Sequence, residues 1–534
     1  MIAIKRALIS VSDKTGIIDF AAALERQGCE IISTGGTRKV LEDAGIRVTG
    51  ISSVTGNPEA FGGRMKTLSF QIGSALLFDR EKDAEEASAL GIAPIDLVVC
   101  NLYPFAEARA QGADLPALIE HIDIGGPTMV RAAAKNYTYV AVVVDPGDYP
   151  DLLNELAENG GAISKETRFR LMRKAFNHTA DYDALIATTL DGQAGELSVR
   201  LAFDRAKKLR YGENAHQEGY FLRQRDAARS YYDMNVLHGK ELSYNNMVDM
   251  YAALESLRDM RTHACAVIKH ANPCGLSSGD DQRKALEYAW AGDPVSAYGS
   301  VIAFNSTVTR GTVDFFELDA EDKSRRKFVE IVVAPGFAPE ALDYLQLHKN
   351  LRIVEFDPRL LTPARDMKFL HGALLYQDTD METWEKTECV TALRPKIDPE
   401  LLDFGLKAVR QLKSNAICAV RKTAAGYCQL LGMGCGQPNR LNSTELTLAR
   451  CRENLLNAWD GAGDPEAYIR ENMAETVLFS DAFFPFPDNV EIAHAAGIRT
   501  IVQPGGSLRD KLVIGKADEL GVGMVFTGMR HFKH

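Results

Sequence analysis

The sequence predicts an α/β protein whose N-terminal part is a doubly wound parallel sheet. Strand-like runs at 6–12, 29–33, 95–102 and 139–144 alternate with helical patterns, the rhythm of parallel βα units. The first two runs end in polar, glycine-containing loops, and strand ends of this kind form the edge at which α/β sheets bind ligands. Because 534 residues are too many for one core, we expect two to four folding units.

The composition excludes several classes of function. The formal net charge is −11 and the isoelectric point about 5.6, whereas a nucleic-acid-binding protein needs a basic face. The nine cysteines are odd in number and form no CxxC pair, so neither a disulfide framework nor a structural zinc site is expected. The N-terminus leads directly into strand-like sequence, and no apolar run could span a bilayer. We expect a cytoplasmic protein that binds neither nucleic acid nor membranes.

The loops after the first two strands predict a phosphate site. Ser10 to Gly16 precedes an amphipathic helix at 17–26 and offers hydroxyls, a lysine and free helix N–H groups. Ser33 to Thr37 contains two glycines that let backbone amides approach an anion. One such loop is more often a helix N-cap, but two at one sheet edge favour a shared phosphate. The residues expected to bind it are Ser12, Asp13, Lys14, Thr34, Gly35, Gly36 and Thr37.

Three further N-terminal segments, at 62–67, 100–104 and 122–135, place ionisable side chains beside glycine or proline. An acid, a base and a stabiliser of negative charge are what the chemistry of a bound phosphorylated ligand requires. The residues expected to supply them are Lys66, Tyr103, Asp123 and Lys135. The alternative for Lys135 is a solvated charge on a helix predicted at 128–136.

A second candidate site is the adjacent pair Lys269 and His270. The apolar run 264–268 predicts a buried strand, and Asn272-Pro273 with Gly275 predicts the loop that ends it. The pair would then lie at the carboxyl end of a strand, where an imidazole can take a proton and an ammonium can stabilise negative charge. The alternative is a solvated lysine beside a core histidine.

Twelve motifs in family order make the chain resemble the bifunctional purine biosynthesis enzymes. This family joins 5-aminoimidazole-4-carboxamide ribonucleotide (AICAR) formyltransferase to inosine monophosphate (IMP) cyclohydrolase. The motifs are SVSDKTG, STGGT, GGRMKT, CNLYPF, IDIGGPTMVRAAAKN, LRYGENAHQ, GKELSYNN, KHANPCG, SNAI, FSDAFFPF, QPGGS and MRHFKH.

The resemblance implies a fold and a division of labour. An N-terminal methylglyoxal-synthase-like domain, residues 1–197, would be the IMP cyclohydrolase, and residues 198–534, built from cytidine-deaminase-like α/β subdomains, would be the AICAR formyltransferase. The enzyme would transfer a formyl group from the cosubstrate 10-formyltetrahydrofolate to AICAR and then close the ring of formyl-AICAR. It would work as a homodimer. No catalytic metal is expected, because the zinc signature of deaminases is missing after Pro273-Cys274; a monovalent cation site stays open.

The resemblance also implies roles for individual residues. Lys269 and His270 would catalyse formyl transfer, while Lys66, Tyr103, Asp123 and Lys135 would catalyse ring closure. Further contacts to IMP or formyl-AICAR would come from Arg64, Thr67, Cys100, Asn101 and Ile124. Contacts to AICAR would come from Arg210, Tyr211, Gly299, Glu330, Asn415, Arg440 and Arg530. Contacts to the folate would come from Leu441, Phe483, Asp488, Ser507 and Leu508; for Phe483, core packing is the alternative to a pterin wall.

The chain departs from the family pattern after Lys66-Thr67. Ser69, Phe70 and Gly73 stand in the segment where the family has two histidines, Tyr137 replaces a frequent histidine, and Pro487 replaces a frequent arginine. Losses around a catalytic site lower activity even when the reacting residues remain. Besides the bifunctional enzyme, two readings therefore stay open: a formyltransferase with weakened or lost cyclohydrolase activity, and a purine-nucleotide sensor.

Overall fold

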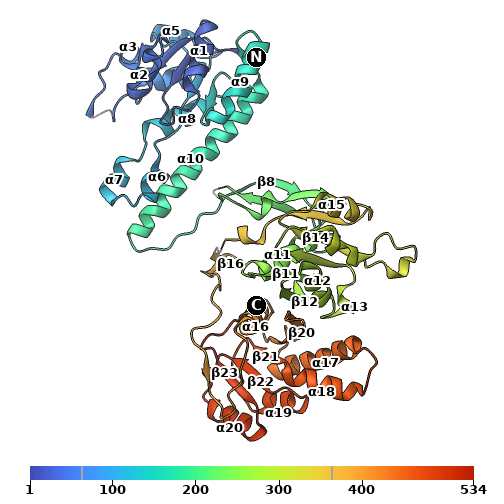
Figure 1. The fold of residues 1–534 in the computed structure, drawn as a ribbon. Helices are drawn as coiled ribbons and strands as arrows, with labels where there is room; N and C mark the ends of the chain where they lie inside the picture. Colours follow the sequence, from blue (N-terminus) through green and yellow to red (C-terminus); the bar gives the residue numbers. More distant parts are fainter. Residues whose placement is uncertain (62–63, 226, 363–364) are drawn as a thin grey trace. The chain divides into compact units, whose positions relative to one another are not determined.

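The structure is a computed structural model and describes residues 1–61, 64–225, 227–362 and 365–534. The chain divides into two compact units, Met1–Ala202 and Phe203–His534 (Figure 1). The predicted domain boundary, between residues 197 and 198, lies in the same segment that connects the last helix of the first unit to the first strand of the second. No helix within the described ranges is long and apolar enough to cross a membrane.

Unit 1 contains a five-stranded, all-parallel sheet in the order β4-β3-β2-β5-β6. Its strands are β2 (Arg6–Ile9), β3 (Glu30–Ser33), β4 (Thr49–Gly50), β5 (Leu97–Val99) and β6 (Ala141–Val143). The chain starts in the middle, moves outward to β4, and then continues through β5 and β6 on the other side. The predicted doubly wound parallel sheet is confirmed.

Helices cover both faces of this sheet because successive side chains of a strand point to opposite sides. Ala7 and Ile9 of β2 pack in one core with α1 and α9, whereas Leu8 packs in another with α3, α4 and α8. The helices are α1 (Ile17–Arg26), α2 (Gly35–Asp43), α3 (Ile51–Thr55), α4 (Phe70–Leu77), α5 (Ala84–Ala89), α6 (Phe105–Ala110), α7 (Leu115–Glu120), α8 (Gly125–Lys135), α9 (Tyr149–Glu158) and α10 (Lys165–Gln193). The long α10 packs along α8 (Figure 1), and a short pair, β1 (Ile2–Ala3) and β7 (Ala162–Ile163), completes the unit.

Unit 2 is built on a twelve-stranded mixed sheet in the order β10-β15-β14-β13-β11-β12-β20-β19-β21-β22-β23-β18. The strands of its first half are β10 (Asn235–His238), β11 (His263–Lys269), β12 (Asn272–Gly279), β13 (Ser300–Phe304), β14 (Val329–Ala334) and β15 (Arg352–Glu355). Those of its second half are β18 (Glu388–Cys389), β19 (Ile417–Lys422), β20 (Cys428–Gly434), β21 (Val477–Ser480), β22 (Thr500–Gln503) and β23 (Gly523–Phe526).

The two halves of this sheet share one topology. In each, an antiparallel hairpin is followed by a helix and by three strands that run parallel to one another: β11-β12 is followed by β13 to β15, and β19-β20 by β21 to β23. The hairpins pair through β12 and β20, where Ser277 faces Gln429. Unit 2 therefore consists of two similar α/β subdomains joined at their hairpins.

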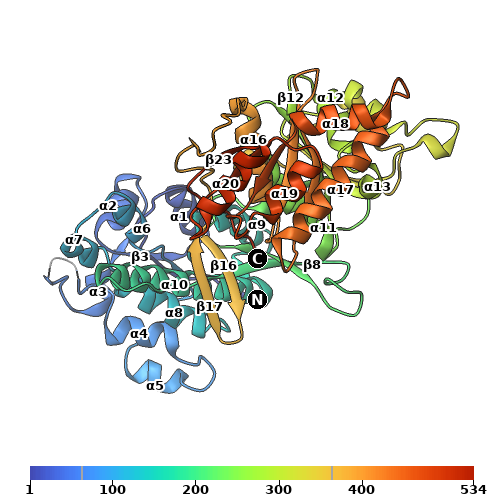
Figure 2. The same ribbon diagram turned by 90° about the horizontal axis from the view of Figure 1, so that it is seen from below.

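The remaining elements of unit 2 surround this sheet. The helices are α11 (Tyr244–Leu257), α12 (Gln282–Trp290), α13 (Pro294–Ala297), α14 (Arg310–Val313), α15 (Pro339–Leu345), α16 (Pro399–Arg410), α17 (Arg440–Ala458), α18 (Pro465–Glu475), α19 (Asp488–Ala495) and α20 (Asp510–Leu520). Two hairpins lie outside the large sheet: β8 (Phe203–Lys208) with β9 (Tyr220–Gln224), and β16 (Arg365–Leu370) with β17 (Ala373–Asp378). Figure 2 shows the second of them as a two-stranded arm.

The prediction of a loop at Asn272-Pro273 and Gly275 is wrong. These residues belong to β12, which pairs with β11 through a two-residue turn at His270 and Ala271. The pairing shifts register between Val267 and Ile268, which accommodates the proline at a bulge. Gly275 is needed for packing, because a Cβ there would lie 1.8 Å from the carbonyl oxygen of Ala289 on α12. Lys269 ends β11 and His270 begins the turn, so the pair lies at the carboxyl end of a strand as predicted, but a hairpin turn follows it in place of the predicted loop.

Candidate active sites

The first candidate site lies at the carboxyl edge of the unit 1 sheet, between β2 and β5. The chain leaves these neighbouring strands in opposite directions, which makes the gap between them the topological switch point where such sheets bind ligands. The Asn101 side chain joins the two strand ends: its Oδ1 accepts the N–H groups of Ser12 (2.5 Å) and Asp13 (2.9 Å). Its Nδ2 donates to the Asp13 carbonyl at 3.0 Å. The two loops are thus held as one surface.

Hydrogen bonds join the loop after β3 to the same surface. The Thr37 hydroxyl donates to the Val11 carbonyl at 2.9 Å, and the Lys14 ammonium donates to that carbonyl and to the Thr37 hydroxyl. Burial lowers the pKa of Lys14. Helix α2 begins at Gly35, so the free N–H groups of its first turn face the site. The two predicted phosphate loops therefore come together as one surface.

Lys66 and Asp123 both lie beside this surface, and the Lys66 ammonium is 4.0 Å from the Glu59 carboxylate. A Cβ on Gly35 would lie 3.3 Å from the Lys66 Nζ, so the ammonium reaches the start of α2. The Asp123 carboxylate accepts the Gly126 N–H at 2.8 Å, at the start of α8. Burial raises the pKa of Asp123, opposed by backbone hydrogen bonds from Gly126 and Tyr103 and by the charge of Lys66. Thr67 is buried against the same helix start, because its hydroxyl would lie 2.9 Å from a Cβ on Gly125.

Tyr103 and Cys100 complete this group. Burial and the charge of Asp123 raise the pKa of the Tyr103 phenol, and burial with the same charge raises the pKa of the Cys100 thiol. The side chains of Lys66, Tyr103 and Asp123 are therefore close enough to influence one another. Three of the four residues predicted to form the acid–base set therefore lie in one region of unit 1, and the fourth is Lys135.

Lys135 lies apart from the other three within one chain. It is the last residue of α8 and is exposed, ten residues after the helix start beside Asp123. At 1.5 Å per residue, this places it roughly 15 Å away along the helix axis. Arg64, which pairs with Glu120 at 2.5 Å, and Ile124 are also exposed. Gly62 and Gly63 lie outside the described residues.

Sequence reasoning missed Tyr182 of α10. Its phenol oxygen accepts the Asp123 N–H at 2.8 Å, and the phenol donates to the His121 carbonyl at 3.1 Å. The long helix thus fixes the loop that carries the site carboxylate. No local motif marks this tyrosine, since it follows Asp123 by 59 residues and acts through the backbone.

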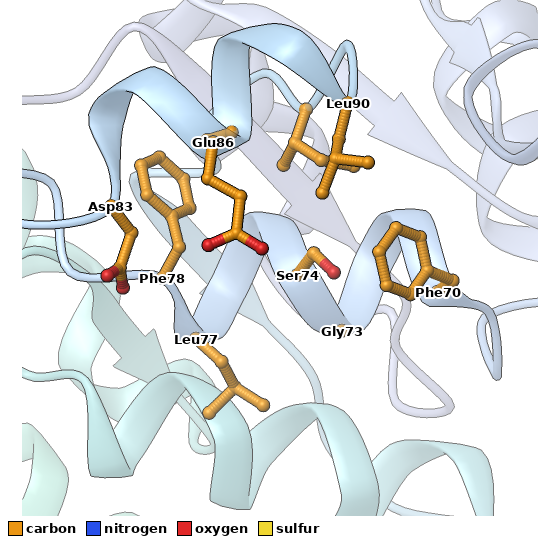
Figure 3. Close-up of a pocket in the computed structure, with 10 residues that line it drawn as sticks. Phe70, Gly73, Ser74, Leu77, Phe78, Asp83, Glu86 and Leu90 are labelled. Carbon is orange, nitrogen blue, oxygen red and sulfur yellow. The ribbon is translucent and has the colours of Figure 1, made fainter.

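Two departures from the family pattern face a different cavity. A surface cavity of about 450 Å³ lies between α4 and α5 (Figure 3). Phe70 and Gly73 line it, together with Leu77, Phe78 and Glu86. Ser69 caps α4, because its hydroxyl accepts the Ile72 N–H at 3.1 Å. No predicted catalytic residue lines this cavity, so these substitutions reshape the α4 surface and leave the Lys66 and Asp123 contacts in place.

The second candidate site lies at the turn between β11 and β12. The Lys269 Nζ donates to the carbonyls of Tyr298 (2.9 Å) and Gly299 (3.2 Å). An ammonium has three donors, so one remains for a ligand. Gly299 has φ +69°, and a Cβ there would lie 3.4 Å from the Lys269 Nζ. Glycine is favoured here by its positive φ, and exposed His270 follows Lys269 directly.

Acidic side chains lie behind this turn. Glu330 of β14 accepts the Arg352 guanidinium at 3.1 Å and the Asn246 amide at 3.3 Å. The Asp249 carboxylate of α11 accepts the Ala271 N–H at 2.7 Å. Burial raises the pKa of Asp249, while the charges of His270 and Lys269 lower it. Asp249 was not predicted from the sequence.

The second half of the sheet contributes a buried polar network to the same edge. Arg440 donates to Asn415 Oδ1 (2.7 Å), to Asp481 Oδ1 (2.6 Å) and to the Ser480 hydroxyl (3.1 Å). Arg440 is buried, so in this arrangement it orients Asn415. The two halves meet where the Cys435 thiol lies 3.3 Å from Asn272 Oδ1. Lys269, Gly299, Glu330, Asn415 and Arg440 are therefore gathered along one edge.

Other predicted ligand residues lie on exposed segments. The Arg210 guanidinium stacks on its neighbour Tyr211, with 5.4 Å to the ring centroid, and Arg530 stacks on Phe532 at 4.8 Å. Both arginines are exposed. Each carries a guanidinium suited to a phosphate, and their roles remain predictions.

The predicted folate residues lie around the ends of β21 and β22. Phe484 is fully buried, whereas Phe483 is 36% and Phe486 48% exposed, so the three phenylalanines divide between core and surface. Asp488 begins α19, Leu441 lies in the first turn of α17, and Ser507 and Leu508 precede α20. Leu508 is fully exposed. These side chains are accessible to a ligand, as a pterin contact requires.

No cluster of three or more His, Cys, Asp or Glu side chains that could hold a metal ion occurs in the part of the chain that the structure describes. The nine cysteines are all free thiols. The charged groups of both sites are supplied by lysine, arginine, histidine and carboxylates.

Comparison with known families gives two matches that together span most of the chain. Residues 16–128 match the MGS-like domain, and residues 133–450 match the AICARFT/IMPCHase bienzyme.

Similar proteins cover the chain almost completely. The bifunctional purine biosynthesis protein PurH of Ruminiclostridium cellulolyticum is 43% identical over 99% of this chain and 100% of its own length. PurH of Bacillus cereus (43%) and of Bacillus mycoides (44%) align over the same shares. A solved structure described as the crystal structure of ForH is 38% identical, covers 36% of this chain and 99% of its own, and has a TM-score of 0.33.

Proposed function

The chain belongs to the AICARFT/IMPCHase bienzyme family of purine biosynthesis, and on that premise we propose how its two units divide the work. The protein carries out the last two steps of IMP synthesis. A formyl group passes from a folate to AICAR, and formyl-AICAR then loses water as its ring closes. Unit 2 performs the transfer and unit 1 the closure. The observation that carries this division is the placement of Lys66 at the start of α2 and of Asp123 at the start of α8, beside the switch point of unit 1.

Formyl transfer requires a base, because the amine of AICAR is a weak nucleophile whose lone pair is drawn toward the carboxamide. His270 takes the amine proton as the nitrogen attacks the formyl carbon of 10-formyltetrahydrofolate. The C–N bond to the folate N10 then breaks, and N10 leaves with a proton. The exposed imidazole at the tip of the turn is accessible to the amine.

Lys269 stabilises the oxyanion of the tetrahedral intermediate. Two backbone carbonyls hold its ammonium and leave one N–H for the developing charge. These two hydrogen bonds hold the ammonium in one position. Folate binding on Phe483, Asp488, Ser507, Leu508 and Leu441, and AICAR binding on Arg210, Tyr211, Gly299, Glu330, Asn415, Arg440 and Arg530, complete the proposed site.

Ring closure needs no cosubstrate. The carboxamide nitrogen attacks the formyl carbon, the carbinolamine forms, and water leaves as the aromatic ring is completed. Asp123 accepts a hydrogen bond from the carboxamide N–H, Lys66 stabilises the formyl oxygen, and Tyr103 exchanges protons. The phosphate binds at the start of α2 on the loops that Lys14, Thr37 and Asn101 hold together.

We further propose that the active form is a homodimer. Lys135 cannot join Lys66 within one chain, since α8 holds it roughly 15 Å from the Asp123 end; a second copy can supply it. The β16–β17 arm exposes Phe369, Leu370 and Leu375, at 74%, 47% and 56%. An apolar surface of this kind favours cover by another protein chain.

Two other functions remain as alternatives. A formyltransferase with a weakened cyclohydrolase is favoured only by the changes at Ser69, Phe70 and Gly73, which lie at α4. A purine-nucleotide sensor would not need the acid–base set of unit 1. Assays of each half reaction distinguish them: His270→Ala should lose transfer but still close the ring of supplied formyl-AICAR. Ring closure lost together with transfer would overturn the division between units, and IMP binding without turnover would favour the sensor.

The proposed scheme uses 10-formyltetrahydrofolate as its cosubstrate and assigns no step to a metal. A monovalent cation site stays a prediction. A cytoplasmic location is proposed from the metabolic role.

A further inference from the structure

The turn that presents His270 has an unfavourable backbone. Lys269 pairs directly with Asn272, so only His270 and Ala271 connect the two strands. Their φ angles are 51° and 59°. Two-residue turns with positive φ at both positions favour Gly, Asn or Asp, because a Cβ clashes with the backbone there. Neither residue of this turn is one of these, so the conformation must be stabilised from outside the hairpin.

Asp249 is placed to provide that stabilisation. Its Oδ1 accepts the Ala271 N–H at 2.7 Å, across 22 residues of sequence. The carboxylate stands on α11, where Met250, Ala253, Leu254 and Leu257 are fully buried beneath the sheet. The acceptor is therefore fixed in position by the core.

The carbonyl of the same peptide group has its own support. Asn272 Nδ2 donates to the His270 carbonyl at 2.9 Å, and Asn272 Oδ1 faces the Cys435 thiol. Asp249 and Asn272 thus hold the N–H and the C=O of one peptide group, the one that joins His270 to Ala271. The Asp249 contact joins this peptide group to a helix packed in the core.

We propose that Asp249 is a positioning residue for formyl transfer: its carboxylate anchors the Ala271 N–H and thereby holds the His270 imidazole beside the Lys269 ammonium. This inference rests on the proposed transferase function of unit 2. It assigns to Asp249 a role as hydrogen-bond acceptor. A role as a negative charge beside His270 is the competing explanation, since these charges do interact.

Three variants separate the two explanations. Asp249→Asn keeps an oxygen acceptor and removes the charge, whereas Asp249→Ala removes both. Ala271→Gly relieves the backbone strain, because glycine adopts positive φ without a Cβ clash. Combined with Asp249→Ala, it should therefore restore part of what the lost hydrogen bond removed. Glu340→Ala, which removes an exposed carboxylate on α15, serves as the matched control.

Each variant is assayed as the full-length protein for formyl transfer and, separately, for closure of supplied formyl-AICAR. We expect Asp249→Ala to lower the kcat of transfer by about a hundredfold with little change in the KM for AICAR. Asp249→Asn should stay near wild type, and Ala271→Gly should recover a large part of the lost kcat in the double variant. Ring closure should be unchanged throughout, which shows that unit 1 is intact, and the unchanged KM for AICAR shows that unit 2 is folded.

Hydrogen exchange tests the anchor without relying on activity. The Ala271 amide should exchange about tenfold faster or more in Asp249→Ala than in wild type or Asp249→Asn. Unchanged exchange would overturn the anchor. An equal loss of transfer in the Asn and Ala variants, with no rescue by Ala271→Gly, would overturn it in favour of the charge. A wild-type protein that transfers no formyl group would instead refute the proposed function, while exchange still reports on the anchor.

Discussion

The phenol oxygen of Tyr182 lies 2.8 Å from the backbone nitrogen of Asp123 and accepts its N–H. The same phenol donates to the His121 carbonyl, so one side chain of α10 holds the loop on both sides of residue 122. The loop in turn presents the carboxylate to the start of α8. The longest helix of unit 1 therefore fixes the loop that carries the proposed catalytic carboxylate.

Tyr182→Phe should lower the kcat of ring closure about tenfold. The substitution leaves the Asp123 N–H without its acceptor, a loss of about 1–3 kcal/mol for a buried group, and each 1.4 kcal/mol is roughly a factor of ten in rate. The measurement is the initial rate of IMP formation from formyl-AICAR. Tyr139→Phe, which removes a phenol bonded to Asp79, is the control and should close the ring normally. An equal loss in both variants would argue against a specific role for Tyr182.

The rate of ring closure should fall on the acid side at a pH above the ordinary carboxyl value of 3.8, because burial raises the pKa of Asp123. The carboxylate accepts the carboxamide N–H, so activity rises with pH through this raised pKa. Stability follows the opposite direction: a carboxyl whose pKa is raised by folding stabilises the fold at low pH and loses that contribution as pH rises. The pH profile of kcat checks this, and Asp123→Asn should abolish the acid limb. A limb that persists in the variant belongs to another group.

Lys269→Arg should abolish formyl transfer although it conserves the charge. The planar guanidinium is larger and cannot occupy the position between the Tyr298 and Gly299 carbonyls that the ammonium fills. Closure of supplied formyl-AICAR should be unaffected and gives the internal control. Full transfer activity in this variant would mean that Lys269 contributes only a diffuse positive potential.

Lys66→Ala and Lys135→Ala should each abolish ring closure and spare formyl transfer, and co-expression of the two should restore part of the closure. The restoration is expected from the proposed homodimer, in which a second copy supplies Lys135 from the far end of its α8. Ring closure measured on purified mixed dimers checks it, with each variant alone as control. If Lys135→Ala closes the ring at the wild-type rate, Lys135 is a surface charge.

Much of unit 1 was predictable because its signals are local. The four strands and the helix at 17–26 have continuous apolar patterns, and the predicted phosphate loops follow their ends, as found at Asn101, Lys14 and Thr37. The catalytic group was only partly predictable. The family resemblance implies that Lys135 acts with Lys66 and Asp123, but the sequence does not show that the length of α8 separates Lys135 from Asp123.

The hairpin at His270 could not be predicted because two residues were misleading. Proline and glycine usually end strands, yet Pro273 occupies a bulge and Gly275 makes room for the Ala289 carbonyl of α12. Both features depend on contacts with other elements of the fold, β11 and α12. Tyr182 and Asp249 could not be predicted for the same reason, since each accepts a hydrogen bond from the backbone of a residue distant in sequence.

The central claim, that one chain carries both chemistries, is tested most directly by following a labelled formyl carbon. The wild-type protein is supplied with AICAR and 10-formyltetrahydrofolate that carries ¹³C in the formyl group, and the products are identified by NMR. The account predicts that the label appears in IMP at C2, the carbon between N1 and N3 of the six-membered ring. Label that accumulates in formyl-AICAR would show that unit 1 does not close the ring, and label that stays on the folate would contradict the transferase.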